Sequence, residues 1–333
     1  MLLPVGLVVA LGLGFAHAQG GCTNDDPKPA NCPNDPKVCP YDLSKIDHSL
    51  DKPTSANKWW KPSSSPTAPT WQIILGTPAK TPDLNKDAYD FDMFDGRAAI
   101  AAVKKADPTK KIICYFSAGS SETWRCDNAC FKAADQGGRL CSWPGERWLN
   151  TKSANVRNVT LARLDVAKSL GCDAVDPDNM DPYDNGSEND LKLTEADAVD
   201  YFNFIADAAH ARNMAVGLKN AASIADRVMS KVDFSVNEEC LGQGNCEDFQ
   251  TFITNKKPVF NIEYPSEDEN EIDKPWTVQQ IKDRCALAAT SDSHSKGFSI
   301  LLKNHNLNDW SATCPYDPAT PPDNGRRAVE FRG

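Results

Sequence analysis

Acidic side chains recur where the short apolar runs of this sequence end. The acids in these positions are Asp90, Asp92, Asp176, Asp178, Glu238 and Glu263. Cleavage of a glycosidic bond needs two carboxyl groups, one that protonates the leaving oxygen and one that acts as nucleophile or activates water. Caps, turns and ion pairs explain any single one of these acids, but a group of them at one end of a parallel sheet favours a functional site. One of the two catalytic carboxyls should lie in an apolar or like-charged setting that raises its pKa.

Other chemistries fit the sequence less well. Histidines are few and scattered, and no Gly-x-Ser-x-Gly elbow is present, so a Ser-His-Asp hydrolase is not indicated. A divalent-metal site competes, because Asp- and Asn-rich loops supply hard oxygen ligands, but the segment from Asp184 to Asp190 lacks the full calcium-loop spacing. We place Asp181, Asp184 and Glu239 in turns or on the surface. We expect no metal and no other cofactor.

Tryptophans supply a second sign of sugar binding. Trp124, Trp143 and Trp148 lie between the third and fourth apolar runs, in a loop that also holds three cysteines. Such a loop either stacks its tryptophans on sugar rings or forms a small satellite core. The sequence leaves both possibilities open.

The elements that carry these residues alternate short apolar runs with helical patterns. Strands are predicted near 71–75, 88–92, 111–116, 172–176, 214–218, 233–237, 258–262 and 298–302. A helix is predicted after Thr194, which can cap it with Asp197 in a capping-box position, and an earlier one carries the stripe that begins at Leu161. Eight such runs predict an α/β fold, a (β/α)8 TIM-like barrel, with an open doubly wound sheet as the alternative. The connection 76–87 is short for a parallel crossover with a helix.

The chain divides into three predicted parts. Residues 1–18 are predicted to be a signal peptide, because an apolar run ends in an Ala-x-Ala pattern, although its start lacks Lys and Arg; a membrane anchor is the alternative. Residues 19–70 form a loop-rich arm with cysteines and prolines that ends in a Pro/Ser-rich linker. Residues 71–333 form the catalytic barrel. We expect Trp59 and Trp60 to pack the arm onto the barrel rather than to stack on sugars.

Twelve cysteines in an exported chain predict disulfides. Cys126, Cys130 and Cys141 lie close together, as do Cys240 and Cys246, so local bridges are expected in both places. A zinc site is not indicated, because the chain has no Cys-x2-Cys pair and no histidine near these clusters. Two Asn-x-Ser/Thr sequons fit an exported glycoprotein.

The charge of the chain bears on its partners. Lys and Arg number 36 against 46 Asp and Glu, a formal net charge of −10. This balance argues against nucleic acid as the main partner and fits either a cationic substrate or simple solubility. We expect a secreted, extracellular monomer that has no membrane association once the signal peptide is removed.

Several short motifs, spread from about residue 71 to 265, together carry a family resemblance. They include Tyr89-Asp90-Phe91-Asp92, Cys114-Tyr115-Phe116-Ser117-Ala118-Gly119-Ser120, Trp143-Pro144-Gly145-Glu146, Asp176-Pro177-Asp178-Asn179, Gly217-Leu218-Lys219-Asn220, Asn237-Glu238-Glu239-Cys240 and Asn261-Ile262-Glu263-Tyr264. In this order they resemble the endo-α-1,4-polygalactosaminidase family, glycoside hydrolase family 114. The segment 19–70 is not covered by the resemblance.

The resemblance implies a TIM-like barrel that cleaves α-1,4-linked galactosamine in partly deacetylated galactosaminogalactan, a microbial exopolysaccharide of biofilms. By motif position it implies Asp178 and Glu238 as the catalytic pair, provisionally with Asp178 as nucleophile or base and Glu238 as general acid/base. Asp176 departs from the glutamate that the family often has there, which bears on specificity. The candidate substrate-binding residues are Asp90, Asp92, Tyr115, Ser117, Trp124, Trp143, Asp176, Asn179, Lys219, Asn220, Glu263 and Tyr264.

The implied substrate gives the negative charge of the chain a specific use. Free galactosamine units are cationic near neutral pH, so an acidic site would attract the polymer. Two other functions stay open from the sequence: a non-catalytic carbohydrate-binding barrel, and a metal-dependent polysaccharide deacetylase or lyase.

Overall fold

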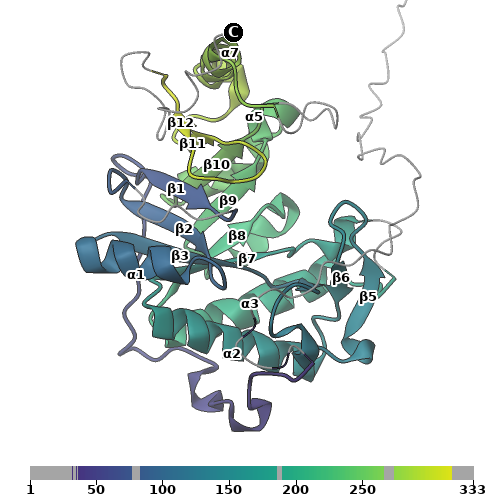
Figure 1. Ribbon diagram of the computed structural model, residues 1–333. Helices are drawn as coiled ribbons and strands as arrows, with labels where there is room; N and C mark the ends of the chain where they lie inside the picture. Colours follow the sequence, from purple (N-terminus) through teal and green to yellow (C-terminus); the bar gives the residue numbers. More distant parts are fainter. Residues whose placement is uncertain are drawn as a thin grey trace, which may run out of the picture.

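A single mostly parallel sheet forms the centre of the molecule (Figure 1). The computed structural model describes residues 32, 35, 37–76, 83–185, 190–265 and 274–316, so the predicted signal peptide lies outside the described residues. The strands follow in the order β1 (Trp71–Ile74), β2 (Ala88–Asp92), β3 (Lys111–Ser117), β7 (Ala174–Asp178), β8 (Ala215–Lys219), β9 (Phe234–Glu238), β10 (Val259–Glu263), β11 (Ser299–Leu302) and β12 (Ala312–Thr313). The eight predicted strands are therefore confirmed, with ends that agree to about two residues.

Strand direction is uniform except at one edge. Every neighbouring pair from β1 to β11 is parallel, and β12 alone runs antiparallel, beside β11. β1 and β2 pair in parallel although their connection is short, and the described parts of that connection contain no helix. The connection between β1 and β2, predicted to be short for a crossover with a helix, therefore has no helix among its described residues.

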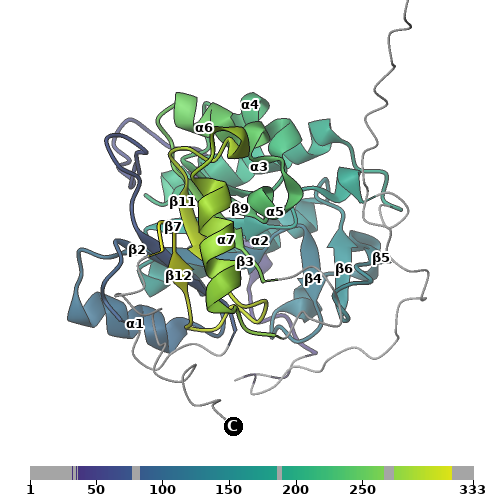
Figure 2. The ribbon, with the colours of Figure 1, turned by 90° about the horizontal axis from the view of Figure 1, so that it is seen from above.

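Helices cover the sheet on its outer side (Figures 1 and 2). They are α1 (Arg97–Ala106), α2 (Ala154–Leu170), α3 (Glu195–Ala211), α4 (Ala225–Val228), α5 (Cys240–Gln243), α6 (Gln250–Thr254) and α7 (Val278–Ala288). The predicted capping box of α3 is confirmed: Asp197 N donates to Thr194 Oγ1 at 3.3 Å, and Thr194 N donates to Asp197 Oδ2 at 2.9 Å. Within the described part of the chain, no helix combines the length and apolar character needed to cross a bilayer.

The two faces of the sheet bury different cores. Alternate residues such as Ala88, Ile113, Ala174 and Phe234 gather into one apolar cluster formed almost wholly by strands, whereas their neighbours pack under the helices. On the inner face of the sheet, side chains of different strands therefore pack against one another.

The first and last parallel strands, β1 and β11, lie close together, but no backbone ladder joins their described residues. Trp71 Nε1 at the start of β1 donates to the carbonyl of Ser299 at the start of β11 at 3.0 Å, and Ser299 Oγ donates to the Pro69 carbonyl at 3.0 Å. The sheet is therefore strongly curled, and the chain has a TIM-like α/β fold.

A small antiparallel sheet is inserted between β3 and β7, and we call it the insert sheet. It contains β4 (Ser120–Glu122), β6 (Glu146–Leu149) and β5 (Gln136–Arg139), in that order. Figure 2 shows these strands to one side of the main sheet, and Figure 1 shows β5 and β6 there. Loop residues of the insert are bridged to the N-terminal arm by the disulfides Cys32–Cys126 and Cys39–Cys130.

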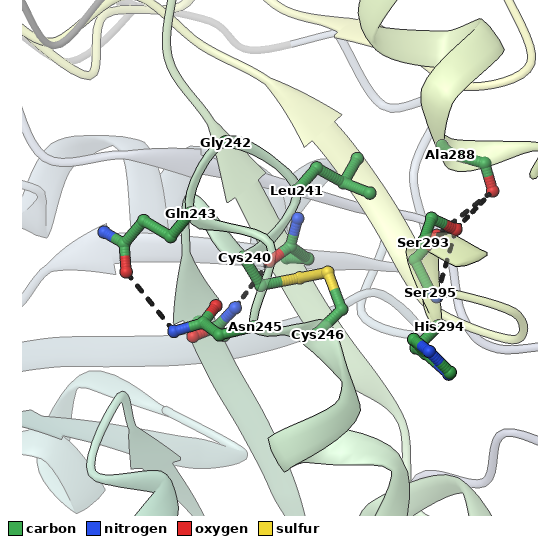
Figure 3. Close-up of a disulfide and its surroundings, with 12 residues drawn as sticks. Cys240, Leu241, Gly242, Gln243, Asn245, Cys246, Ala288, Ser293, His294 and Ser295 are labelled. Atoms are coloured by element: carbon green, nitrogen blue, oxygen red, sulfur yellow. Dashed lines mark hydrogen bonds between the residues drawn. A yellow bond between two sulfur atoms is a disulfide. The ribbon is translucent and has the colours of Figure 1, made fainter. Parts of the chain in front are cut away.

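The prediction of local bridges is wrong for Cys126 and Cys130, because folding brings the arm, about ninety residues earlier in the chain, against the insert. Cys141 is also disulfide-bonded. The local bridge Cys240–Cys246 is confirmed and closes the turn around α5 (Figure 3). The remaining bridges between described residues are Cys114–Cys172 and Cys285–Cys314.

The tryptophan pair of the arm packs against the amino end of the sheet. Trp59 stacks on His210 with ring centroids 3.9 Å apart, and its Nε1 donates to Asp233 Oδ1 at 3.1 Å. Trp60 packs beside Phe234, the first residue of β9. The expected packing role is confirmed, and this pair lies at the end of the strands opposite to Asp178 and Glu238.

Candidate active site

Asp178 and Glu238 are joined by one buried lysine. Each of the three residues is the last of its strand: Asp178 of β7, Lys219 of β8 and Glu238 of β9. Lys219 Nζ lies 3.3 Å from Asp178 Oδ1 and 3.0 Å from Glu238 Oε2. Adjacent parallel strands thus bring together two carboxylates that are 60 residues apart in sequence.

The environment of Glu238 favours its charged form. Burial works to raise the pKa of this carboxyl, but Lys219, then hydrogen bonds from Tyr264 and Asn220, outweigh it and lower the pKa to about 2. Tyr264 Oη donates to Glu238 Oε1 at 2.6 Å, and Asn220 Nδ2 donates to Glu238 Oε2 at 3.1 Å. This differs from the expectation that the provisional acid would have a raised pKa, and the reason is the neighbouring lysine.

Asp178 is held from the opposite side. Tyr115 Oη, from β3, donates to Asp178 Oδ2 at 2.9 Å. Burial and the adjacent carboxylate raise the pKa of Tyr115 well above its usual value, so this phenol stays a hydrogen-bond donor. Tyr115 and Lys219 together fix both oxygens of Asp178.

Backbone geometry at the strand ends is unusual. Asn179, Asn220 and Glu239, each following one of the three site residues, have positive φ values of 60°, 47° and 61°. Such left-handed conformations cost free energy outside glycine and cluster at functional sites. A Cβ on Gly119 would lie 1.7 Å from the Asn179 carbonyl, so only glycine allows the β3 end to approach β7 this closely. The N–H groups of Ala118 and Gly119 both donate to the Asp178 carbonyl.

Asp90 and Asp176 lie one layer deeper. Both are fully buried, and none of their carboxyl oxygens receives a hydrogen bond from a donor group among the described residues. Burial and their mutual repulsion raise the pKa of Asp90, and burial and the charge of Asp178 raise that of Asp176, although Lys219 acts in the opposite direction. Two such carboxyls share a proton more readily than they hold two charges. These two carboxyls interact electrostatically with Lys219 and Asp178, and because they are fully buried a polymer cannot contact them.

Asp92 and Glu263, also candidates for substrate contact, are bonded within the protein. Asp92 is 3% exposed and pairs with Arg125 of the insert. Glu263 is fully buried on the outer face of β10, where it accepts from the backbone of Leu241 at 2.8 Å and pairs with Arg284. The alternation of β10 points Glu263 away from the inner face that carries Asp178.

Glu146 was not among the predicted site residues, although it closes the Trp-Pro-Gly-Glu motif. Its Oε2 accepts from Ser120 Oγ and lies 3.4 Å from Asn179 Nδ2. Asn179 Nδ2 also donates to Ser117 Oγ at 2.8 Å. Burial, then Glu122, raises the pKa of Glu146 to about 8, and Asp178 adds to this. Ser117 and Asn179 thus connect the insert to the end of β7.

The remaining candidates lie in the insert and the following turn. Trp143 is 62% exposed and Trp124 is half-buried, whereas Trp148 is buried in the insert. Asp181 begins a 3-10 turn, as expected, but burial and the charge of Asp178 raise its pKa to about 6. In the described part of the chain, no group of three or more His, Cys, Asp and Glu side chains is arranged to hold a metal ion.

Comparisons with known proteins give one family match and several similar solved structures. The family described as glycoside-hydrolase family GH114 matches residues 49–318, so the match begins inside the predicted arm. The crystal structure of Aspergillus fumigatus Ega3 in complex with galactosamine is 44% identical, has a TM-score of 0.69, and covers 78% of this chain and 99% of its own. A variant of the glycoside hydrolase domain of PelA from Pseudomonas aeruginosa is 12% identical with a TM-score of 0.51, covers 72% of this chain and 96% of its own, and is alike in fold alone. A comparison with curated proteins gives no match.

Proposed function

From the premise that the chain belongs to glycoside hydrolase family GH114 and is a glycoside hydrolase, we propose that it cleaves α-1,4-galactosaminidic bonds inside partly deacetylated galactosaminogalactan. The observation that carries this proposal is the pair of carboxylates, Asp178 and Glu238, held on either side of Lys219 at the ends of the two strands that flank β8. The similar Ega3 structure, solved with galactosamine, supports an amino-sugar substrate.

The proposed mechanism uses Asp178 and Glu238 as the acid and the nucleophile. Their nearest oxygens contact the same Lys219 Nζ at 3.3 and 3.0 Å, so they are separated by no more than the sum of these contacts. Retaining glycosidases hold their carboxyls about 5–5.5 Å apart, and inverting ones about 6.5–9.5 Å. This upper bound lies below the inverting range and favours retention through a covalent glycosyl-enzyme intermediate. Because Glu238 rests as the carboxylate, its setting suits the nucleophile better than the acid.

The charge of the site suits a cationic polymer. Asp178 and Glu238 face one lysine, and Glu146 and Asp181 add ionisable carboxyls at the same end of the sheet. A polymer of ammonium-bearing sugars would be attracted to this end and would favour the ionised forms of these acids. We therefore propose substrate capture by charge as well as by shape.

We also propose the finer organisation predicted from the sequence. The eight parallel strands are interpreted as a (β/α)8 barrel spanning 71–333, preceded by an arm at 19–70 and a cleaved signal peptide at 1–18. The disulfides between described residues support export, since such bonds persist in oxidising compartments. We propose a secreted, glycosylated monomer that acts without a metal or other cofactor.

The proposal is tested by mass spectrometry of soluble products. Mature protein incubated with partly deacetylated α-1,4-galactosaminogalactan should release a ladder of short oligosaccharides. The ladder should be absent with Asp178→Asn and with Glu238→Gln, while circular dichroism shows both variants folded. If the polymer binds but stays intact with the wild-type protein, the chain is a carbohydrate-binding barrel. If cleavage needs added divalent metal, or if acetyl groups or unsaturated sugars are released, the alternative metal-dependent enzyme is favoured.

A further inference from the structure

Glu146 is a buried carboxyl that the proposed acid and nucleophile leave unused. It is the first residue of β6 and is 7% exposed. Ser120 Oγ and Asn179 Nδ2 both reach its Oε2, and Asn179 directly follows Asp178 in the chain. The insert sheet therefore fixes this carboxyl close to the end of β7, where Asp178, the proposed acid, is located.

The second oxygen of this carboxyl is available. Among the described residues no donor contacts Glu146 Oε1, and Oε1 is not one of the side-chain oxygens that are both buried and unpartnered. An oxygen that lacks a partner and is not fully buried keeps some contact with solvent. Glu146 thus has one oxygen held by hydrogen bonds and one without a partner among the described residues.

The negative charges near Glu146 favour the binding of a cation. Glu122 lies opposite Glu146 in the ladder between β4 and β6, and its Oε2 is buried with no hydrogen-bond donor. Arg125, which pairs with Glu122 at 3.1 Å, is also engaged by Asp92 and Asp95. Burial and the repulsion of Glu122 and Asp178 raise the pKa of Glu146 to about 8. An ammonium group beside Glu146 would relieve this repulsion and stabilise the carboxylate.

An exposed aromatic ring lies on the same turn. Glu146 N donates to the Trp143 carbonyl at 3.0 Å, and Trp143 N donates to the Leu140 carbonyl at 3.0 Å, so a tight turn joins the two residues. Trp143 is 62% exposed, although tryptophan normally buries its large apolar surface. A galactosamine unit presents both an apolar ring face and an ammonium group, which match an indole and a carboxylate.

We propose that Glu146 is a specificity-determining residue that binds the ammonium group of a galactosamine unit beside the cleaved bond, while Trp143 stacks on a sugar of the same chain. This inference rests on the proposed function. N-acetylation replaces the cation by a neutral, bulkier amide, which neither pairs with a carboxylate nor relieves the repulsion around it. The enzyme should therefore select deacetylated units at this position.

The experiment compares two polymers, one fully deacetylated and one partly N-acetylated. Glu146→Gln keeps the shape of the side chain and resembles the protonated acid of the free protein, so the fold should be preserved. We expect kcat/KM on the fully deacetylated polymer to fall about tenfold or more, as is typical when a charge-assisted hydrogen bond is lost. The loss should be smaller on the acetylated polymer, and product sequencing should show N-acetylated units at a position that the wild-type protein excludes.

Two further variants complete the design. Glu146→Asp keeps the charge and should keep the preference for deacetylated units, with weaker binding because the side chain is shorter. Asp207→Asn is the matched control, since Asp207 pairs at 2.7 Å with Lys231, which precedes β9 at the other end of the sheet. This control should leave both the rate and the preference unchanged.

The results separate failure of this inference from failure of the proposed function. If the wild-type protein cleaves the polymer, Asp178→Asn does not, and Glu146→Gln keeps the wild-type preference for deacetylated units, the inference is overturned while the function stands. An equal loss of kcat on both polymers, with a changed basic limb of the pH profile, would also overturn it and would make Glu146 a proton donor. If the wild-type protein cleaves neither polymer, the proposed function fails, and with it the inference that rests on it.

Discussion

Replacement of Lys219 by methionine tests whether one cation controls the charge of both catalytic candidates. Lys219 is 5% exposed and contacts Asp178 and Glu238 at 3.3 and 3.0 Å. Methionine has a similar length without the charge. In Lys219→Met, burial is no longer opposed by a cation, so the pKa of Glu238 should rise from about 2 to above its ordinary value of 4.5.

The size of the effect follows from linkage. A pKa lowered from 4.5 to about 2 stabilises the folded protein by about 3 kcal/mol, or about 2 kcal/mol once the 26% exposure of the Glu238 side chain is allowed for. Because the folded pKa is the lower one, this contribution is fully present above pH 4.5 and is lost as the pH falls toward 2. The variant loses it and also keeps buried carboxylates without a partner, so we expect a total loss of about 3–5 kcal/mol at pH 7.

Urea unfolding of the wild-type protein and of Lys219→Met, at several pH values from 7 to 3, measures this difference. The difference in unfolding free energy should shrink as the pH falls, because protonation removes the uncompensated charge from the variant first. The acid limb of kcat/KM should move up by about two pH units or more. Lys231→Met, which breaks the pair with Asp207, should leave the acid limb in place. A stability difference that is the same at pH 7 and pH 3 would refute the reasoning and would assign Lys219 a packing role.

Three further results are expected. KM on the fully deacetylated polymer should rise several-fold when NaCl is raised from about 0.05 to 0.5 M, because salt screens the attraction of a polycation; a flat response would remove charge steering. EDTA should leave the rate unchanged, and a loss restored by a divalent metal would favour the metal-dependent alternative. Azide should restore glycosyl transfer to Glu238→Gly, with proton NMR showing that wild-type hydrolysis first releases the α-anomer. Formation of the β-glycosyl azide by Asp178→Gly instead would return the nucleophile role to Asp178.

Strands and long helices could be predicted from the sequence because local rules decide them. The apolar run at Ile112–Phe116 is buried on both faces of the sheet, and a strand of this kind needs no information from distant residues. The capping box at Thr194 and Asp197 fixes where α3 begins, whatever the helix later packs against. The short crossover between β1 and β2 was the one local feature that argued against a parallel pair, and the described parts of that connection contain no helix.

Properties that depend on distant partners could not be predicted. Cys126 and Cys130 lie near each other in sequence, but their partners are Cys32 and Cys39, which only the folded arm brings close. The pKa of Glu238 is lowered by Lys219, a residue of another strand, so sequence spacing gave no hint of its direction. Glu146 reaches the site through the insert sheet, and only its place in a family motif could have drawn attention to it.

Depth along the strand decides what each inner acid can do. β2 and β7 have the same alternating pattern, Ala88-x-Asp90-x-Asp92 and Ala174-x-Asp176-x-Asp178, so period two directs all four acids toward the inner face. The alanines join the apolar cluster at the base of the sheet. Asp90 and Asp176 follow, sealed from solvent, and of the two last positions only Asp178 keeps part of its side chain exposed.

At that last position the two strands diverge. Asp92 forms an ion pair with Arg125 of the insert. Asp178 instead contacts a tyrosine and a lysine, and 18% of its side chain stays exposed. A sequence pattern reports the direction of a side chain but not its depth or its partner. Asp178 can therefore be the reacting acid, while Asp90 and Asp176 share a proton and Asp92 anchors the insert.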